Sequence, residues 1–325
     1  MYISGNKYIG FKLESSPYTA PQSDLLQADF DLLVENVSYS ANIQESKLLF
    51  LSGDSSAFKS VMGKQDVTVS FRVPVTQGAT AATAPKWWKC MQACGCKVTT
   101  FTTTGISLTP SDAYGATPAY IEIHEVSDDN TQIPLVIQIR GAMGNPKYVL
   151  ETVGSPAYVE FEFKGVLQGI EDRAALTKPT GYDTVAPYPV MNTTLTAFGE
   201  ALDLDKFTLD MKNKVELYAD PATGLNGYSG ARVARDKSDP ATLQVDPFLQ
   251  SVANRAIYSR WSGATTGAFV CDIGTLLHLT APAIQIVKAF DGASRNSATV
   301  QTLNCILTRG ASGNDEWELL QGSKT

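Results

Sequence analysis

The segment DLLVENVSYSANIQESKLLFLSGDSSAFKSVMGKQDVTVSFRVPV, residues 31–75, indicates the fold of the chain. It opens with a strand-like run over residues 32–39. It closes with a run in which apolar side chains occupy every second position: Val67, Val69, Phe71, Val73 and Val75. A period of two is typical of a half-buried β-strand. Residues 52–66 between the runs are polar and contain Gly and Ser, which predicts a long arm in place of a tight turn.

The composition limits the classes of function. A length of 325 residues predicts two domains with separate cores. The net charge of -7 argues against a protein that grips nucleic acid by its phosphates. Five cysteines and the lack of a basic, apolar leader argue against a secreted disulfide framework. No apolar run approaches the ~18 residues of a membrane span. We therefore expect synthesis in the cytosol and no membrane insertion.

The order of features repeats in the second half of the chain. A strand-like run starts at residue 202, with a phase slip at Asp205 and Lys206 that predicts a bulge, and a second polar arm covers residues 219–240. Three pairs of positions align the halves at offsets of 170, 162 and 147: Leu32 with Leu202, Trp87 with Leu249, and Ile137 with Ile284. Offsets that fall steadily fit a second copy with shorter connections.

Each half also contains one short helical pattern. Pro85 starts the first, with an apolar face of Trp87, Cys90, Met91 and Cys94. In the second, Asp246 is placed to cap a helix and Pro247 to start it. The predicted fold is mainly β (α+β), a tandem of two similar β-sandwich or barrel domains, each with one flanking short helix and a long inter-strand arm. The first domain covers 1–172, with an irregular N-terminal arm over 1–27; a linker covers 173–190 and the second domain 191–325.

The sequence gives little support for an enzyme. His124 and His278 are the only histidines, and neither a Gly-rich phosphate loop nor a G-x-S-x-G elbow is present. Cys90 and Cys94 share an apolar helix face and lack C-x-x-C spacing, so buried thiols are favoured over a zinc cluster. We expect no catalytic residues, no metal and no cofactor.

Four segments carry a family resemblance: GNKYIGFKLESSPY (5–18), LLVENVSY (32–39), FKSVMGKQDVTVSFRVPV (58–75) and ARVARDKSDPATLQV (231–245). They are similar to the tail tube (major tail) proteins of long-tailed bacteriophages, in the variety that has two tube domains in one polypeptide. The resemblance implies self-assembly into stacked rings, with three chains giving each ring pseudo-six-fold symmetry, around a channel for genome delivery. The protein would assemble in the host cytoplasm and reside in the virion tail.

The resemblance also implies the partners. They are other copies of the chain, the tape-measure protein, the tail terminator, and distal tail or baseplate proteins. Genomic DNA would pass without specific binding, and no membrane is involved. The long arms would contact the next ring, and the candidate arm residues are Ser55, Phe58, Lys59, Met62, Lys64, Tyr228, Arg232, Arg235 and Lys237.

Glu160 and Glu162 are the candidate channel-lining residues. They alternate with Val159, Phe161 and Phe163, which puts both carboxylates on the wet face of one strand. An acidic lumen would keep DNA from adhering to the wall.

Two alternatives remain open at this stage. The first is a related part with the same fold, either a distal tail or baseplate ring protein or the tube of an injection machine. The second is a carbohydrate-binding β-sandwich adhesin that uses Trp87, Trp88 or Trp261.

Overall fold

The computed structural model of the chain is mainly β, with two α-helices among its described residues. It describes residues 2–15, 23–47, 59–101, 104–111, 117–127, 134–152, 154–173, 181–183, 185–187, 189–191, 195–201, 204–221, 227–247, 251–273, 276–295, 298–311 and 313–323. The elements of the first half are β1 (Tyr2–Leu13), η1 (Gln27–Asp29), β2 (Glu35–Ser46), β3 (Val61–Pro74), α1 (Trp88–Ala93), β4 (Cys96–Phe101), β5 (Gly105–Pro110), β6 (Ala119–Ser127), β7 (Leu135–Leu150) and β8 (Tyr158–Asp172). Those of the second half are β9 (Leu195–Ala197), β10 (Glu200–Ala201), β11 (Leu204–Asp210), β12 (Lys214–Ala219), β13 (Tyr228–Ala234), β14 (Thr242–Pro247), α2 (Ser251–Ser262), β15 (Thr266–Ile273), β16 (Leu277–Arg295), β17 (Ala298–Leu307) and β18 (Glu318–Gly322).

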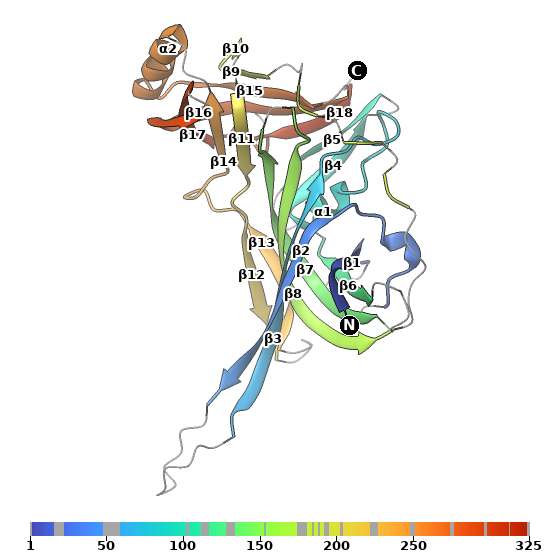
Figure 1. The fold of residues 1–325 in the computed structure, drawn as a ribbon. Helices are drawn as coiled ribbons and strands as arrows, with labels where there is room; N and C mark the ends of the chain where they lie inside the picture. Colours follow the sequence, from blue (N-terminus) through green and yellow to red (C-terminus); the bar gives the residue numbers. More distant parts are fainter. Residues whose placement is uncertain are drawn as a thin grey trace, which may run out of the picture.

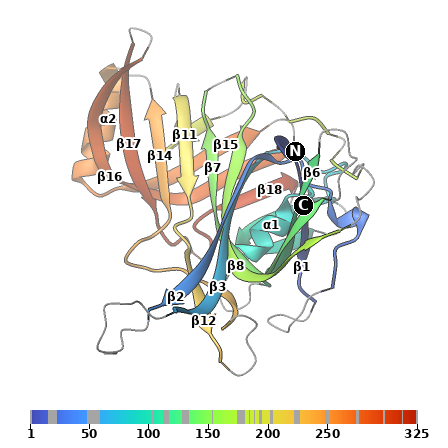
Figure 2. The same ribbon diagram turned by 60° about the horizontal axis from the view of Figure 1, so that its bottom comes forward.

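Eight antiparallel strands lie side by side in one continuous row (Figure 2), in the order β2-β3-β8-β7-β11-β14-β17-β16. Apolar and polar side chains alternate along the central strands, so one face is buried and the other is polar. In β8, for example, Phe161 and Phe163 are buried whereas Glu162 between them is exposed. The predicted alternation is therefore confirmed for this strand.

The pairing of β7 with β11 joins the two halves of the chain within this row. Tyr148 pairs with Leu209, and both side chains are buried. As a result the buried residues of both halves belong to one large hydrophobic cluster. The expectation of separate cores is wrong for the described residues, because the junction strands continue the apolar face of one half into the other.

Two long strands of the row also pair with strands that lie outside it (Figure 1). Strand β7 also pairs with β6, which pairs with β1, and β16 also pairs with β15, which pairs with β9. Strand β18, near the C-terminus, lies between β16 of the second half and β5 of the first. Among the described residues, strand pairing thus joins the halves at β7 with β11 and at β5 with β18.

Gln321 on β18 fixes a connecting segment of the first half. Its side chain is fully buried, accepts a hydrogen bond from the Gly78 N–H (2.8 Å) and donates to the carbonyl oxygens of Thr80 (2.6 Å) and Thr83 (2.8 Å). The amide supplies one acceptor oxygen and two N–H donors, and a carboxylate in its place could not donate.

We expect Gln321→Glu to lower the free energy of unfolding by about 2 kcal/mol or more, because the buried carbonyl oxygens lose donors. Urea unfolding measures the change. The matched control is Gln285→Glu, on the polar face, where water can solvate the new carboxylate. Equal unfolding midpoints for the two variants would contradict this role of Gln321.

The first helix follows the prediction and the second starts later than predicted. Helix α1 begins shortly after Pro85, and Gly95, with φ of 83°, lies directly after its cap. Asp246 and Pro247 end β14 instead of starting a helix. Asp246 pairs with Lys206 across the β11–β14 ladder, at 3.2 Å between Nζ and the carboxylate. Sheet pairing therefore overrides the local capping signal.

The predicted irregular arm at the N-terminus is wrong for residues 2–13, which form β1. Ile9 pairs with Ile123 and Phe11 with Ile121 on β6, and all four side chains are buried. Gly10 lies between them, and a Cβ there would approach the Phe30 ring to 2.7 Å. The period-two pattern was present in this segment but too short to distinguish from loop without knowledge of β6.

Candidate functional site

The candidate functional site is the polar face of the eight-stranded row. One line of directly paired residues crosses all eight strands on this face: Glu35, Arg72, Glu160, Lys147, Asp210, Thr242, Ile306 and Gln285. A neighbouring line contains Ser38, Ser70, Glu162 and Asn145. Directly paired residues share a face, so these lines form a mostly hydrophilic wall that extends over both halves of the chain.

The first five residues of the long line alternate in charge, and we call Glu35, Arg72, Glu160, Lys147 and Asp210 the charge ladder. The Arg72 guanidinium lies 2.9 Å from Glu35, and the Lys147 ammonium lies 3.5 Å from Glu160. Burial would lower the pKa of Arg72, but its hydrogen bond to Glu35 together with the negative charges of Glu35 and Glu151 raises it. Opposite charges across strands contribute about 0.2–1 kcal/mol a pair. Glu35 and Glu160 are therefore each opposed by a cation, and the five side chains together carry one net negative charge.

Both predicted channel-lining residues lie on this polar face. The charge of Glu160 is opposed by Lys147, whereas Glu162 is exposed and pairs with the uncharged Ser70 and Asn145. The face is thus less acidic than the two glutamates alone suggest. Sequence reasoning missed the other ladder residues because a period of two shows the face of a side chain but not its neighbour across the strands.

Both ends of the row are open strand edges. Within the described residues, β2 pairs with β3 alone, and beyond Gln285 strand β16 pairs with β17 alone. An edge presents backbone N–H and C=O groups to which another strand can pair. The row could therefore be continued at either end by another polypeptide.

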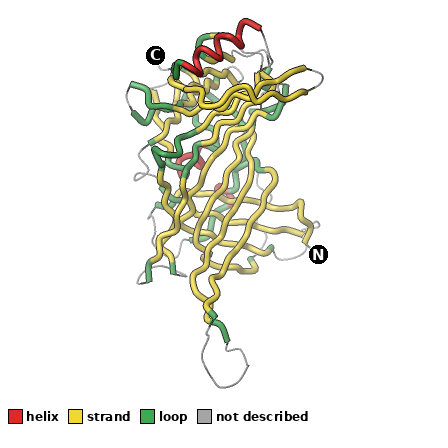
Figure 3. Tube along the Cα trace, turned by 90° about the vertical axis from the view of Figure 1, so that its left-hand side faces the viewer, coloured by secondary structure: helices red, strands yellow, loops and turns green. Residues whose placement is uncertain are grey.

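The first predicted arm corresponds to a hairpin. Strands β2 and β3 extend together beyond the rest of the chain (Figures 1 and 3). On this hairpin Lys59 and Met62 are exposed, and the Lys64 ammonium lies 5.2 Å from the centre of the Tyr228 ring. Ser55 and Phe58 lie outside the described residues. Contact with a next ring stays a prediction for these positions.

The second predicted arm folds back onto its own chain as the β12–β13 hairpin. Its apolar side chains Ala231 and Val233 are buried against Met143 of β7, and Arg140 of β7 donates to the Tyr228 carbonyl oxygen (3.0 Å). The extended arm expected here is therefore replaced by a packed hairpin. The reason is its alternating apolar residues, which the Gly-rich composition obscured.

The remaining second-arm residues divide between contact and exposure. Arg235 lies 3.4 Å from Glu316, in the C-terminal part of the chain. Arg232 is exposed with its guanidinium 4.7 Å from the centre of the Tyr218 ring, and Lys237 is also exposed. The positive charge predicted for this region is thus partly paired within the chain.

A buried carboxylate, Glu122 on β6, lies at the centre of a polar network. It accepts hydrogen bonds from the Leu25 N–H (3.1 Å), the Tyr120 hydroxyl (3.1 Å) and the Arg173 guanidinium (2.8 Å), and His124 Nε2 lies 3.0 Å away. Every partner comes from this chain and the carboxylate is fully buried. We assign the network a structural role, in which it ties the segment before β2 to β6.

This network predicts a specific acid sensitivity. Burial would raise the pKa of Glu122, but the hydrogen bonds from His124 and Arg173 outweigh it and lower the pKa. A lowered folded-state pKa stabilises the fold above the unfolded-state value of about 4.3, and this stabilisation is lost as the pH falls through the folded-state pKa. We expect Glu122→Gln to be less stable at pH 7 by about 1–3 kcal/mol, with a shallower loss of stability between about pH 5 and 3. Urea unfolding at pH 7 and between about pH 5 and 3 measures the free energy of unfolding of both proteins. Parallel plots of this free energy against pH for the variant and the wild type would contradict the prediction.

The thiols offer no reactive group. All five cysteines are buried and free, and burial raises the pKa of Cys96 and of Cys271 to about 12. Thiols with such pKa values stay protonated at neutral pH and are poor nucleophiles and metal ligands. Within the described part of the chain, no three His, Cys, Asp or Glu residues are grouped so as to hold a metal ion.

Two of the three tryptophans considered for sugar binding are inaccessible. Trp87 and Trp88 are each 1% exposed and pack edge to face at 6.3 Å between ring centres. A sugar cannot stack on either, so this part of the adhesin alternative is wrong. Trp261 on α2 is 37% exposed, and its indole N–H donates to the Val287 carbonyl oxygen.

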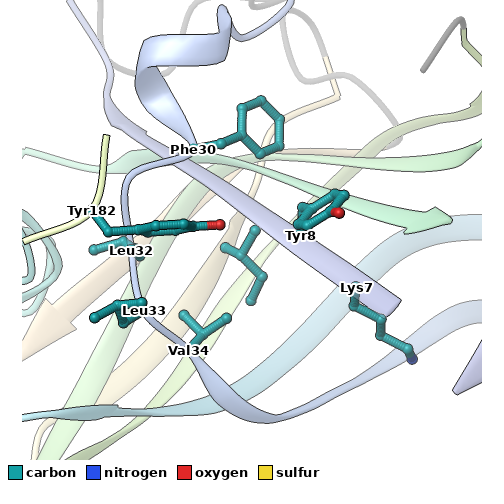
Figure 4. A pocket seen from close by; sticks show the side chains of 8 residues that line it. Lys7, Tyr8, Phe30, Leu32, Leu33, Val34 and Tyr182 are labelled. Carbon is teal, nitrogen blue, oxygen red and sulfur yellow. The ribbon is translucent and has the colours of Figure 1, made fainter. Parts of the chain in front are cut away.

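A small pocket of about 150 Å³ lies between β1 and the segment that precedes β2 (Figure 4). Its lining is largely apolar and aromatic: Lys7, Tyr8, Ile9, Phe30, Leu32, Leu33, Val34 and Tyr182. Small-molecule sites usually measure about 300–1,000 Å³. This pocket is therefore a poor candidate for a substrate site.

Neither helix α1 nor any other described helix combines the length and the apolar character needed to cross a bilayer.

No protein-family model matches the chain, and no curated protein gives a significant sequence match. The features of the chain that bear on its function are therefore the polar face, its two open edges and the projecting hairpin.

Proposed function

We propose that this chain is a structural subunit that closes edge to edge into rings and stacks into a tube, as the tail tube proteins of long-tailed bacteriophages do. The polar face of the eight-stranded row would line the channel. In this proposal the protein resides in the virion tail, and genomic DNA passes through the channel.

The observation that carries the proposal is the order of strands on the two sides of the β7–β11 junction. The first half contributes β2-β3-β8-β7 and the second contributes β11-β14-β17-β16. If β11, β14, β17 and β16 are the counterparts of β2, β3, β8 and β7, the junction joins the last strand of one set to the first strand of the next. The open edges β16 and β2 are the same two kinds of strand, so a second copy can repeat the junction between chains.

Other features support two related domains. A helix follows β3 in one half and β14 in the other. Strands β7 and β16 carry an extra residue at matching places, since residues 140–143 oppose 166–164 and residues 288–291 oppose 304–302. Each bulge follows an Ile-Gln-Ile sequence, at 137–139 and 284–286. We therefore retain the tandem, with domains at 1–172 and 191–325, as part of the proposal.

The chemistry of the polar face suits a channel wall. Hydroxyl, amide and charge-compensated side chains cannot accumulate the many phosphate contacts that would stop moving DNA. In this account the wall avoids adhesion mainly through the paired charges of the charge ladder, with Glu162 adding negative charge. The tape-measure protein would occupy the channel during assembly, and the tail terminator and the distal tail or baseplate proteins would contact the end rings.

Stoichiometry tests the proposal. The resemblance implies a ring of six strand sets, so two sets in each chain of 35.0 kDa predict closure by three chains. Native mass spectrometry of rings released under mild conditions should give three chains or multiples of three. A closed assembly of two or four chains would contradict the ring of six strand sets, and a strictly monomeric protein at high concentration would contradict the function.

A further inference from the structure

The β12–β13 hairpin provides a precedent for how the strand junction is reinforced. This hairpin continues from β11 and β14 and covers the part of β7 that lies next to the junction. Met143 on β7 is 1% exposed beneath Ala231 and Val233 of the hairpin. The Arg140 side chain is fully buried there and bonds to the hairpin backbone. Strand pairing at β7–β11 is thus accompanied by a second contact, between an apolar hairpin and the neighbouring strand.

The counterpart hairpin, β2–β3, carries apolar side chains that are about half exposed among the described residues. Ile43 is 45% exposed, Val61 51% and Met62 61%. Ile43 pairs with Gln65 and Glu45 with Met62, so Ile43 and Met62 lie on the same face of the hairpin. Exposed apolar side chains grouped in this way mark an interaction surface.

Strand β16, the counterpart of β7, likewise has an uncovered apolar residue at its bulge. Val287 is 46% exposed and directly precedes Lys288, which aligns with Arg140 when the two bulges are superposed. The first half thus has a hairpin with exposed apolar side chains. The second half has a strand segment at which the Val287 side chain is half-exposed, although its carbonyl oxygen accepts a hydrogen bond from Trp261 on α2.

We infer that the β2–β3 hairpin of one copy docks on β16 around Val287 of the next copy in the same ring. This inference rests on the proposed function. It gives the hairpin a lateral role that is additional to any contact of its tip with another ring. Ile43 and Met62 would be buried between copies in the way that Ala231 and Val233 are buried within the chain.

Cross-linking tests the contact. The double variant Met62→Cys/Val287→Cys, assembled and treated with a short bismaleimide, should yield dimer and trimer bands on a denaturing gel and nothing larger, because three copies close the ring. The native cysteines are buried, so they leave the reaction to the introduced thiols. The matched control is Met62→Cys/Ile170→Cys, because Ile170 is also an exposed apolar residue (54%) but lies on β8. It should give no ladder.

Each outcome separates the docking contact from the proposed function. Tubes without cross-links in the double variant would overturn the docking contact and leave the tube proposal standing. A ladder that continues beyond trimers would place the hairpin on another ring and also overturn lateral docking. Monomers in both the variants and the unmodified protein would overturn both proposals. Loss of assembly in the folded double variant alone would support docking, because neither side chain is needed for the fold.

Discussion

One of the two adjacent substitutions Ser40→Pro and Ala41→Pro should leave the chain folded and abolish its assembly. Both residues lie on edge strand β2, and both are exposed. Successive N–H groups of a strand point to opposite sides. One of these two N–H groups therefore donates a hydrogen bond to β3, and the other points away from β3. Proline removes a single N–H and is tolerated at an edge when that N–H faces outward.

The two variants serve as each other's control. The substitution that removes the inward N–H should lower the free energy of unfolding, because it disrupts the β2–β3 ladder. The other should unfold at nearly the wild-type urea concentration yet remain monomeric in sedimentation experiments at concentrations where wild type forms rings. Each outward hydrogen bond contributes about 0.5–1.5 kcal/mol, and the proline ring also blocks the approach of a neighbouring strand. Ring formation by both variants would show that β2 is not a joining edge.

Replacement of residues 48–59 by an Asn-Gly turn, which keeps Lys47 opposite Ser60 as the pairing of Ser46 with Val61 requires, should stop assembly at rings. The substitution removes the tip that the resemblance assigns to ring-to-ring contact, and it retains the strand edge of β2 together with Ile43 and Met62. Asn-Gly is a favoured sequence for a tight hairpin turn, so the fold should be preserved. Sedimentation should show single rings in place of long particles.

The same replacement has two informative contrary results. Tubes of wild-type length would remove the tip from the stacking contact. Monomers would mean that the tip is needed for the lateral contact as well, which would contradict its separation from the docking hairpin. Equal urea midpoints for the replaced and unmodified chains are the control for folding.

Local patterns in the sequence predicted the elements that alternate strongly. The apolar positions of residues 67–75 and 157–167 correspond to the buried faces of β3 and β8, and the bulge near Lys206 is present as a register shift in β11. These features succeeded because a strand with one wet face must alternate, whatever its partner is.

Pairing between distant segments could not be predicted in the same way. Nothing local to Tyr148 or Leu209 identifies one as the partner of the other, because strand pairing is decided by the packing of whole sheets. The charge ladder depends on the same register. The sequence contained each ladder residue, but only the paired strands bring Arg72 between Glu35 and Glu160.

For two segments, the structure predicted from local sequence features was wrong. Residues 219–240 contain several glycines, which favoured an extended arm, yet Ala231 and Val233 pack against Met143 of β7. Asp246 and Pro247 have the chemistry of a helix start, yet they remain in the sheet because Asp246 pairs with Lys206. In both segments a tertiary contact outweighs a local propensity of about 1 kcal/mol.

Electron microscopy of the purified, concentrated protein tests the central claim most directly. The account predicts rings or stacked tubes with a central hole, three-fold symmetry in end-on averages, and strands β2 to β16 facing the hole. Particles that remain monomeric at every concentration and salt condition, or that assemble with the polar face turned outward, would contradict it.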